Sequence, residues 1–359
     1  MAVRSGDFKG QKHSSEWYRH CGHFSGFSHG NKLTGYTMGG NALKQTTTRR
    51  YAAAEYYRAY KALEPRLTSI VRAERVALIP AYREKESFGD MDILYSGDSL
   101  TVDAVAAEFI PNQIVKNGDV ISFDYNQLQI DLINTKTFDY SLAYFSYNDL
   151  GNLVGKLARR LGLKHGHTGL RLPVRYGNHF LNEILVTTCH DDTLEFLGLD
   201  PAVFYRGFDT LNDIFNFVAS SKYFNPAAYA LENVSAAGRV RDKKRHTYTE
   251  FLKFCSSYTG DVLEMGDKSL YLGAIFDRWP HVAEQFRTIT SEALLTVEAG
   301  NRLNGEVVKQ ITGLSGVELG RFMATVKQHE LLGNSAVVMH LDHATIQQIV
   351  EELYAKYVN

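Results

Sequence analysis

Two aspartates, Asp90 and Asp92, stand two residues apart in the segment ESFGDMDIL. In an extended strand alternate side chains share a face, so both carboxylates would point the same way while Met91 and Ile93 point into the core. Carboxylates paired in this way hold hard divalent cations against a phosphate. An Asp-x-Asp pair also arises often by chance, and a plain exposed strand edge is the alternative.

A third carboxylate, Asp131, follows in a predicted β-hairpin. Residues 119–124 and 128–133 are two segments of period-2 hydrophobicity separated by a few polar residues, a pattern typical of paired strands. Asp131 lies among apolar neighbours in the second arm, where a charge costs several kcal/mol unless it is paired or bound to a metal. Beside the strand of Asp90 and Asp92, it would complete a three-carboxylate cluster.

The residues before the aspartate pair are of the types that bind phosphate. Val76 to Ile79 is predicted to form a short buried strand, and residues 82–87 a polar connection. This connection carries cationic and hydroxyl donors towards the glycine that precedes Asp90. Strand, connection and carboxylate strand together predict a site for a triphosphate and its metals.

Three runs of the sequence carry a resemblance to a known family. YREKESFGDMDILYSG, then LQIDLI, then AYFSYNDLGNLVGKLARRLGL resemble, in the same order, the palm of the X-family DNA polymerases, the polymerase beta type of the nucleotidyltransferase superfamily. The segment DDTLEFLGLDPAVF is similar to the closing thumb segment of that family. The resemblance covers residues 70–206, approximately.

The resemblance implies an α+β fold with a polymerase-beta-like nucleotidyltransferase palm, a small α/β thumb and an α-helical C-terminal domain. The expected parts are an N-terminal arm and helix (1–65), the palm (66–150), the thumb-like subdomain (151–206) and the helical domain (207–359).

The resemblance also implies roles for single residues. Asp90 and Asp92 would bind both metal ions, and Asp131 would bind the catalytic one and lie nearest the attacking 3′-hydroxyl. The nucleotide contacts it implies include the β- and γ-phosphates, the sugar and the base, and they fall on Arg83, Ser87, Gly89, Tyr144, Phe145 and Asn152. Lys85 is expected to join Arg83 in neutralising the departing pyrophosphate.

Two departures from the family pattern affect these contacts. Ile79-Pro80-Ala81 stands where the family has a small Gly-Ser pair, and proline removes a backbone donor there. The phosphate contacts would then depend more on Arg83, Lys85 and Ser87, or the turn is rearranged.

The second departure concerns the sugar contacts. Residues 146–148, Ser-Tyr-Asn, replace the family's Thr-Gly-Ser turn, which leaves the choice between deoxyribose and ribose open. For Tyr144 and Phe145 themselves, a plain aromatic core is the alternative in a chain with 12% aromatic residues.

Composition limits the classes of protein that fit. The 359 residues carry a net charge of −1, so nucleic acid would have to bind a local basic patch. Cys21, Cys189 and Cys255 are too few for a disulfide framework, which fits a reducing cytosol and a cytoplasmic protein. Neither a membrane-length apolar run nor a signal peptide is recognisable, so no membrane partner is expected.

The first part of the chain is expected to be an irregular arm, rich in glycine, serine, threonine and histidine, up to residue 48. His20, Cys21, His23 and His29 match no zinc-binding spacing, and solvated loop histidines are the simpler interpretation. Tyr51 to Leu67 then has the spacing of a helix that packs on the palm.

The region after residue 206 has helical patterns, at 210–220, at 249–257 and in several segments from residue 282 onwards. Between the first two lies the segment GRVRDKKRHTY, residues 238–248, called the basic segment below. It is interpreted either as a solvated charged loop or as a contact to a phosphate backbone. The contact residues would be Arg239, Arg241, Lys243, Lys244 and Arg245.

Residues 301–331 weakly resemble a helical segment of the CCA-adding enzymes and bacterial poly(A) polymerases. The resemblance rests on an Asn-Gly followed by a turn with Gly313, Gly316 and Gly320. Glycines so spaced allow a backbone to approach either a phosphate or another helix.

The sequence therefore predicts a nucleotidyltransferase that uses two Mg²⁺ or Mn²⁺ ions to add nucleoside monophosphates from (d)NTP to a nucleic-acid 3′-hydroxyl. An X-family-like DNA polymerase is the first version, and an RNA or tRNA 3′-end transferase, of CCA-adding or poly(A) type, is the second. A protein nucleotidylyltransferase or a nucleotide-signal synthase is a third possibility, and a catalytically silent nucleic-acid-binding module the last. Whether a template strand is copied distinguishes the first two.

Overall fold

The structure is a computed structural model in which two compact units are distinguished. Of the described residues, the first comprises 42–71, 75–78, 86–97 and 100–134, and the second comprises 79–85, 135–177, 179–264 and 266–358. Both contain helices and strands, so the predicted α+β class is confirmed. His20, Cys21, His23 and His29 lie outside the described residues, which are 42–71, 75–97, 100–177, 179–264 and 266–358.

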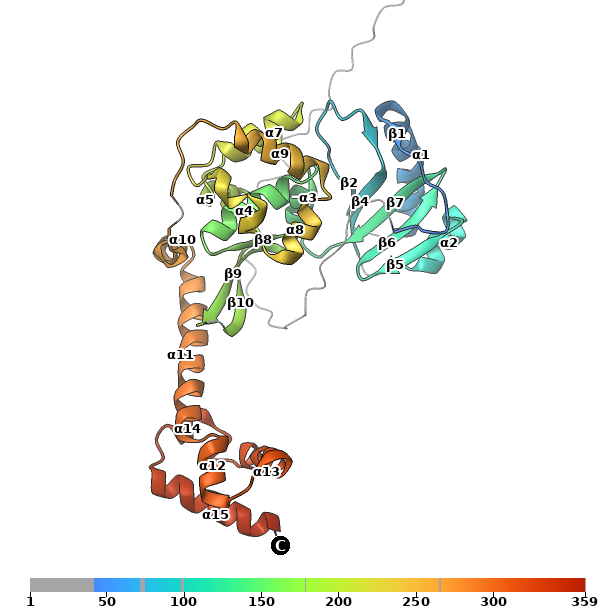
Figure 1. Ribbon diagram of the computed structural model, residues 1–359. Coiled ribbons are helices and arrows are strands. Elements are labelled where there is room, and N and C mark those ends of the chain that lie inside the picture. Colours follow the sequence, from blue (N-terminus) through green and yellow to red (C-terminus); the bar gives the residue numbers. More distant parts are fainter. Residues whose placement is uncertain (1–41, 72–74, 98–99, 178, 265, 359) are drawn as a thin grey trace, which may run out of the picture. The chain divides into compact units, whose positions relative to one another are not determined.

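A five-stranded sheet of order β2-β4-β7-β6-β5 organises the first unit (Figure 1). The central strands β4 and β7 run parallel, and the other neighbours are antiparallel, so the sheet is mixed. The strands are β2 (Arg75–Leu78), β4 (Asp90–Ser96), β5 (Ile114–Asn117), β6 (Val120–Tyr125) and β7 (Leu128–Asn134).

The predicted hairpin is confirmed as β6 and β7, which pair antiparallel. Its two turn residues, Asn126 and Gln127, have φ angles of 50° and 65°. Positive φ at both central residues is the conformation whose twist matches that of the flanking strands. The tight turn therefore fixes the register that places Asp131 on β7.

One face of this sheet is apolar and is covered by helices α1 (Ala53–Val71) and α2 (Val102–Phe109). Met91 and Ile93 have no exposed surface, as their alternation with the aspartates predicts. The ring of Phe109 in α2 lies 5.0 Å from that of Phe123 in β6, centroid to centroid. The carboxylates on alternate positions of β4 and β7 therefore belong to the opposite face.

The helix predicted from Tyr51 begins two residues later, because Tyr51–Ala52 forms the short strand β1 and pairs with β3 (Ser87–Phe88). Its buried face is Tyr56, Leu63, Leu67 and Val71. Tyr56 stacks on Phe88 at a centroid distance of 3.9 Å. This stack joins the helix to the strand that leads into Asp90.

The second unit has a three-stranded antiparallel sheet of order β10-β9-β8 with helices packed around it (Figure 1). The helix predicted over 210–220 is confirmed as α7, and the one over 249–257 as α9. The strands are β8 (Lys164–Gly166), β9 (Gly169–Tyr176) and β10 (His179–Thr187). The helices here are α3 (Phe138–Phe145), α4 (Leu150–Arg160), α5 (His190–Phe196), α6 (Pro201–Arg206), α7 (Leu211–Ala219), α8 (Ala236–Asp242), α9 (His246–Ser256) and α10 (Leu272–Arg278), with 3₁₀ turns η2 (Pro226–Ala228), η3 (Leu231–Asn233) and η4 (Lys268–Tyr271).

The last helices have a hydrophobic core of their own, which includes Val308, Phe322, Val326 and Ile346. α11 contacts both β9 and β10 and also α14. These helices are α11 (Pro280–Arg302), α12 (Gly305–Thr312), α13 (Gly316–Gln328), α14 (Ser335–Val338) and α15 (His343–Val358).

The glycines of the 301–331 segment do not bring two helices close together. A Cβ atom added at Gly313, Gly316 or Gly320 would meet no atom within 4 Å, so the predicted helix contact is wrong. Gly313 and Gly316 have φ angles of 74° and 58°, a conformation that glycine adopts without strain. Their physical role here is to end α12 and to begin α13.

None of the helices in the described part of the chain has the length and apolarity that crossing a membrane requires.

Candidate functional site

The three predicted carboxylates come together on the polar face of the five-stranded sheet. β4 and β7 pair in a register that sets Asp92 beside Asp131 and Asp90 beside Gln129. Asp90, Asp92 and Asp131 each offer an oxygen atom, and these oxygens lie within 4.8 Å of one another. We call these three residues the acidic cluster.

Asp131 is the most buried member, with 5% of its surface exposed. Both of its oxygens accept hydrogen bonds from Nε2 of Gln129, at 3.0 and 2.9 Å. Burial raises the pKa of Asp131 to about 6, although hydrogen bonds from Ser122 and Gln129 oppose the rise and the charge of Asp90 adds to it. Without a metal, the site therefore disfavours ionisation of Asp131, which would add a third negative charge to the acidic cluster.

The residues of this site fit a hard divalent cation. Such ions prefer carboxylate and amide oxygens on rigid elements, and the cluster lies on two central strands. Gln129 is fully buried and its Oε1 atom has no hydrogen-bond donor in the described part of the chain. An orphaned oxygen and a carboxylate with a raised pKa are both costly, and a cation beside them would lower that cost.

A fourth aspartate on the same face, Asp124, is occupied by other groups. Its oxygens accept hydrogen bonds from Nδ2 of Asn112 and from the backbone N–H of Gln113, both at 2.7 Å. These bonds hold the loop before β5 against β6. Asp124 is therefore a structural carboxylate. The alternation of side chains along β6 does not by itself distinguish it from the members of the acidic cluster.

Ser87 and Gly89, two of the predicted phosphate contacts, lie directly before the cluster in the first unit. Arg50, which the sequence did not single out, reaches both of them. Its Nε donates to Ser87 Oγ at 3.1 Å and its Nη2 to the Ser87 carbonyl at 2.8 Å. A Cβ atom added at Gly89 would lie 3.0 Å from Arg50 Nη1. In the sequence, the pair Arg49-Arg50 directly before the predicted helix could have indicated this cation.

Arg83 and Lys85, the other predicted phosphate contacts, belong to the second unit. Arg83 Nη1 lies 2.5 Å from Oδ1 of Asp209, and Nη2 donates to the carbonyl of Arg206. Lys85 donates to Oδ1 of Asn148 at 3.3 Å. The structure therefore gives Arg83 a carboxylate partner, and its predicted phosphate contact stays a prediction.

The Ser-Tyr-Asn turn at 146–148 has larger side chains than the Thr-Gly-Ser turn of the X-family polymerases, and its backbone has an unusual conformation. Tyr147 and Asn148 have φ angles of 60° and 62°, which are rare for residues other than glycine. The backbone N–H of Tyr147 donates to the carbonyl of Pro80 at 2.7 Å, and its ring packs edge-on against Phe208 at 4.9 Å. Packing holds a conformation that a glycine would adopt freely.

Tyr144 and Phe145 are the last two residues of helix α3, and both are half buried. Tyr144 packs edge-on against His165, with 4.9 Å between centroids, and Phe145 stacks on His167 at 5.5 Å. Burial lowers the pKa of His165 to about 4, so the ring against Tyr144 is neutral. The two rings therefore pack against histidines as well as apolar groups, and neither ring is fully exposed. Their predicted contact with the sugar stays a prediction.

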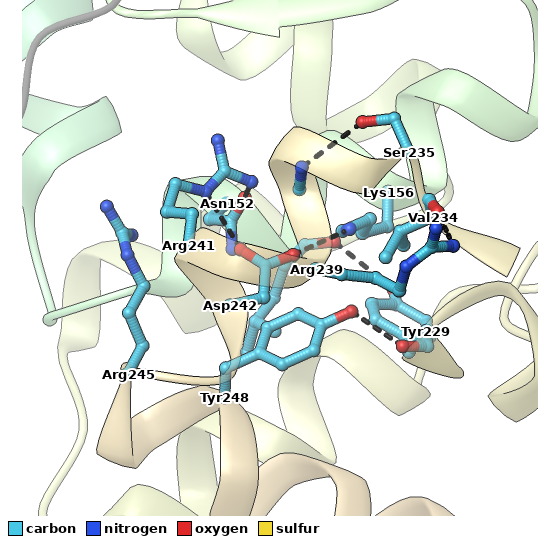
Figure 2. Close-up of polar contacts among 12 residues, drawn as sticks. Asn152, Lys156, Tyr229, Val234, Ser235, Arg239, Arg241, Asp242, Arg245 and Tyr248 are labelled. Atoms are coloured by element: carbon cyan, nitrogen blue, oxygen red, sulfur yellow. Dashed lines mark hydrogen bonds and ion pairs between the residues drawn. The ribbon is translucent and has the colours of Figure 1, made fainter. Parts of the chain in front are cut away.

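Asn152 lies in the first turns of α4 and is in contact with the basic segment (Figure 2). Arg241 Nη2 donates to Asn152 Oδ1 at 3.1 Å. Asn152 Nδ2 is buried and has no acceptor within the described residues. Nearby, Arg245 forms an ion pair with Asp149, the N-cap residue of α4. Two cations of the basic segment thus bind the N-terminal end of this helix.

The basic segment is not a solvated loop, so that interpretation is wrong. Most of it is helical, in α8 and in the start of α9. Asp242 has no exposed surface and accepts hydrogen bonds from Lys156 Nζ at 3.0 Å and Arg241 Nε at 2.8 Å. Burial opposes its ionisation, but these bonds outweigh burial and hold the pKa of Asp242 below its usual value.

Three of the five predicted nucleic-acid contacts are bound to other groups of the chain. Arg239 donates to the carbonyl of Val234 at 2.9 Å, and Arg241 and Arg245 bind carboxylates. Lys243 and Lys244 are exposed, and their side chains have no hydrogen bond or ion pair with any described residue. The two lysines are the residues of the segment that remain available to a phosphate backbone.

Comparison with known families and proteins adds no further constraint, since no family model and no curated protein matches this chain.

Proposed function

We propose that this chain is a metal-dependent nucleotidyltransferase with a palm of the polymerase beta type. It would add nucleoside monophosphates from a nucleoside triphosphate to the 3′-hydroxyl of a nucleic acid, most like an X-family DNA polymerase. The observation that carries the proposal is the acidic cluster, with three oxygens of Asp90, Asp92 and Asp131 within 4.8 Å of one another on two adjacent parallel strands.

Asp90 and Asp92 would each hold both ions, and Asp131 would hold the one beside the attacking hydroxyl. Two Mg²⁺ or Mn²⁺ ions, when bound, stabilise the charge on the attacking and leaving oxygens of an in-line phosphoryl displacement. The carboxylates themselves are pre-positioned, because β4 and β7 are central strands and Gln129 fixes both oxygens of Asp131. Such rigidity is what a phosphoryl-transfer site requires.

Asp131 would also receive the proton of the 3′-hydroxyl. The bond that forms joins the 3′-oxygen to the α-phosphorus, and the bond that breaks releases pyrophosphate.

Arg50, Ser87 and Gly89 would bind the departing phosphates in the first unit. Arg50 offers a charged donor beside the hydroxyl of Ser87, and charge-assisted donors neutralise the leaving group in phosphoryl transfer. Arg50 would therefore supply a phosphate donor in place of the backbone N–H that Pro80 lacks.

A 3′-end transferase for RNA or tRNA is the second candidate. Two features of the sequence support it: the weak resemblance of residues 301–331, and the Ser-Tyr-Asn turn at 146–148 in place of Thr-Gly-Ser.

A transfer assay tests the proposal. The protein is incubated with Mg²⁺ or Mn²⁺, one labelled dNTP or NTP at a time, and single-stranded DNA, primed DNA or tRNA, and the products are separated on a denaturing gel. Extension of primed DNA in template order is expected for the polymerase, and additions to RNA independent of a template for the second candidate. The Asp103→Asn variant, which changes an exposed carboxylate of α2, serves as the matched control for Asp131→Asn. Absence of transfer to every acceptor, or label found only on the protein or in a small nucleotide product, would contradict the proposal.

A further inference from the structure

A small cavity in the second unit has four cations among its nine lining residues. Its volume is about 130 Å³, and no acidic side chain lines it. It lies at the C-terminal end of α4, against η4 and the residues that precede α8. We call it the cationic cavity, and its charged and polar side chains are Lys156, Arg159, Arg160, Asn233, Lys268 and Tyr271.

Arg160 is a buried cation without a carboxylate partner. It is 8% exposed, and its guanidinium donates to the carbonyls of Tyr223 at 2.6 Å and of Leu263 and Glu264 at 2.9 Å. Carbonyl oxygens satisfy hydrogen bonds but carry no net charge. Among the described residues no carboxylate lies within ion-pair distance of Arg160, so its buried charge is uncompensated, which costs free energy.

Lys156 is also buried, with 4% of its side chain exposed. Its partner Asp242 is shared with Arg241, so one carboxylate faces two cations (Figure 2). Asp242 therefore sets one negative charge against the two positive charges of Lys156 and Arg241.

Arg159 and Lys268 supply two further cations at the rim. Both are exposed, and neither side chain makes a hydrogen bond or an ion pair with a described residue. A Cβ atom added at Gly162 would lie 3.4 Å from Cβ of Lys268, so the lysine stem lies against the end of α4. The adjacent carboxylate, Asp267, instead accepts from the backbone N–H of Ser269 at 3.0 Å.

We propose that the cationic cavity binds a phosphoryl group, either the phosphate of a nucleic acid or free inorganic phosphate. Two guanidinium and two ammonium groups belong to the side chains that line this cavity, and such groups are the donors that a tetrahedral dianion requires. The cavity is smaller than the roughly 300–1,000 Å³ of sites that enclose a drug-sized ligand, so it holds a phosphoryl group and excludes a nucleoside. The proposal does not depend on nucleotidyl transfer.

Phosphate titration by calorimetry tests it, with the full chain in chloride buffer without metal or nucleotide. The double variant Arg159→Gln/Lys268→Gln removes the two rim cations and leaves the buried contacts of Arg160 and Lys156 in place. The matched control, Arg287→Gln/Lys327→Gln, removes one arginine and one lysine on α11 and α13, away from the residues that line the cavity.

We expect saturable phosphate binding that weakens at least tenfold in the rim variant and is unchanged in the control. Absence of binding by the unmodified chain, or equal weakening in both double variants, overturns the proposal. The second outcome would mean that the chain attracts phosphate only through its overall charge.

Two oligonucleotides of one sequence, with a 5′-phosphate and with a 5′-hydroxyl, identify the source. Tighter binding of the phosphorylated strand, abolished in the rim variant, assigns the cavity to a nucleic-acid end. Equal binding of both strands, with inorganic phosphate displaced by neither, assigns it to free phosphate. Because no divalent metal or nucleotide is present, failure here leaves the transfer proposal untouched, and failure of transfer leaves this one untouched.

Discussion

The acidic cluster of the first unit and the basic segment of the second hold charges of opposite sign and compensate them differently. The donors that reach Asp131 among the described residues, Gln129 and Ser122, are neutral. In the basic segment, Arg241 and Arg245 each bind a carboxylate, Asp242 and Asp149.

This difference separates a ligand site from a structural network. A carboxylate kept among neutral donors on rigid strands has a raised pKa and gains from an incoming cation. A cation already paired with a buried carboxylate gains much less from an incoming phosphate, because the pair would first have to be broken. Within the basic segment, Lys243 and Lys244 have no such partner, so they are the cations that a phosphate could bind without breaking an ion pair.

Replacing Asp131 by Asn should have the largest effect on activity. We expect nucleotide incorporation to fall by on the order of 10³-fold, since the variant lacks one preorganised charge at the reacting group. Primer extension or tailing measures the rate, and circular dichroism checks that the fold is intact. Near wild-type turnover would remove the acidic cluster from the proposed site.

Breaking the buried pair of the basic segment should have the largest effect on stability. Asp242→Ala leaves Lys156 buried without a counter-ion and should lower the free energy of unfolding of the second unit by about 3–5 kcal/mol. The double variant Asp242→Leu/Lys156→Met should recover most of this stability, because no unpaired charge remains. Urea unfolding measures both.

The control for this pair is Glu250→Gln, which removes a carboxylate that contacts the exposed Lys253. It should leave the unfolding midpoint unchanged. If Asp242→Ala behaves in the same way, the basic segment is not an internally compensated network.

The pH dependence of the metal-free protein should reveal the uncompensated carboxylate. Because the pKa of Asp131 is raised to about 6 in the folded state, the folded protein holds this proton more tightly than the unfolded chain. The stabilisation from the proton is complete below the usual pKa of an aspartate and is lost as the pH rises through 6.

We expect unmodified protein to become less stable than Asp131→Asn by roughly 2–3 kcal/mol between pH 4 and pH 7 without metal. Mg²⁺ affinity should change in the opposite sense and increase over the same interval, because the ion requires the ionised carboxylate. Parallel stability curves for the two proteins would show that Asp131 titrates normally.

Arg50→Gln tests whether the first unit supplies its own phosphate-binding cation. Without this charge-assisted donor the KM for the nucleoside triphosphate should rise by roughly tenfold, with a smaller change in kcat. Arg58→Gln removes an exposed arginine from α1 and should leave KM unchanged. An unaltered KM in Arg50→Gln would assign the phosphate contacts to other residues.

The smallest effect is expected for Lys243→Ala/Lys244→Ala. Stability should not change, and the salt dependence of nucleic-acid binding should become less steep, by roughly 0.7–0.9 in log–log slope for each phosphate that the variant no longer neutralises. Filter binding across a salt series measures the slope. A slope equal to that of the unmodified protein would show that the basic segment does not bind the phosphate backbone.

The sequence predicted the two strands of the acidic cluster from local rules. Alternation placed Asp90 and Asp92 on one face of a strand, and the hairpin pattern placed Asp131 on a second strand; the parallel pairing that sets β7 beside β4 is seen only in the structure. Both placements follow from the two-residue period of a strand, which any window of the sequence displays.

Arg50 and Asp242 could not be assigned in this way. Arg50 lies 37 residues before Ser87, and its partner is decided by the pairing of β1 with β3. Asp242 stands within a run of cations, and its burial depends on Lys156, which lies 86 residues earlier. Interactions between residues so far apart in the chain leave no periodic trace in the sequence.

Residue types and their spacing along the chain therefore determined by themselves which strands form and which face of β4 carries carboxylates. Only the tertiary structure decided which charges remain uncompensated. It left Asp131 among neutral donors, paired Asp242 with Lys156 and Arg241, and gathered Arg159, Arg160 and Lys268 around one cavity. The reason is physical: periodicity fixes the direction of a side chain relative to its own backbone, whereas the compensation of a charge depends on neighbours that only folding brings within a few ångströms.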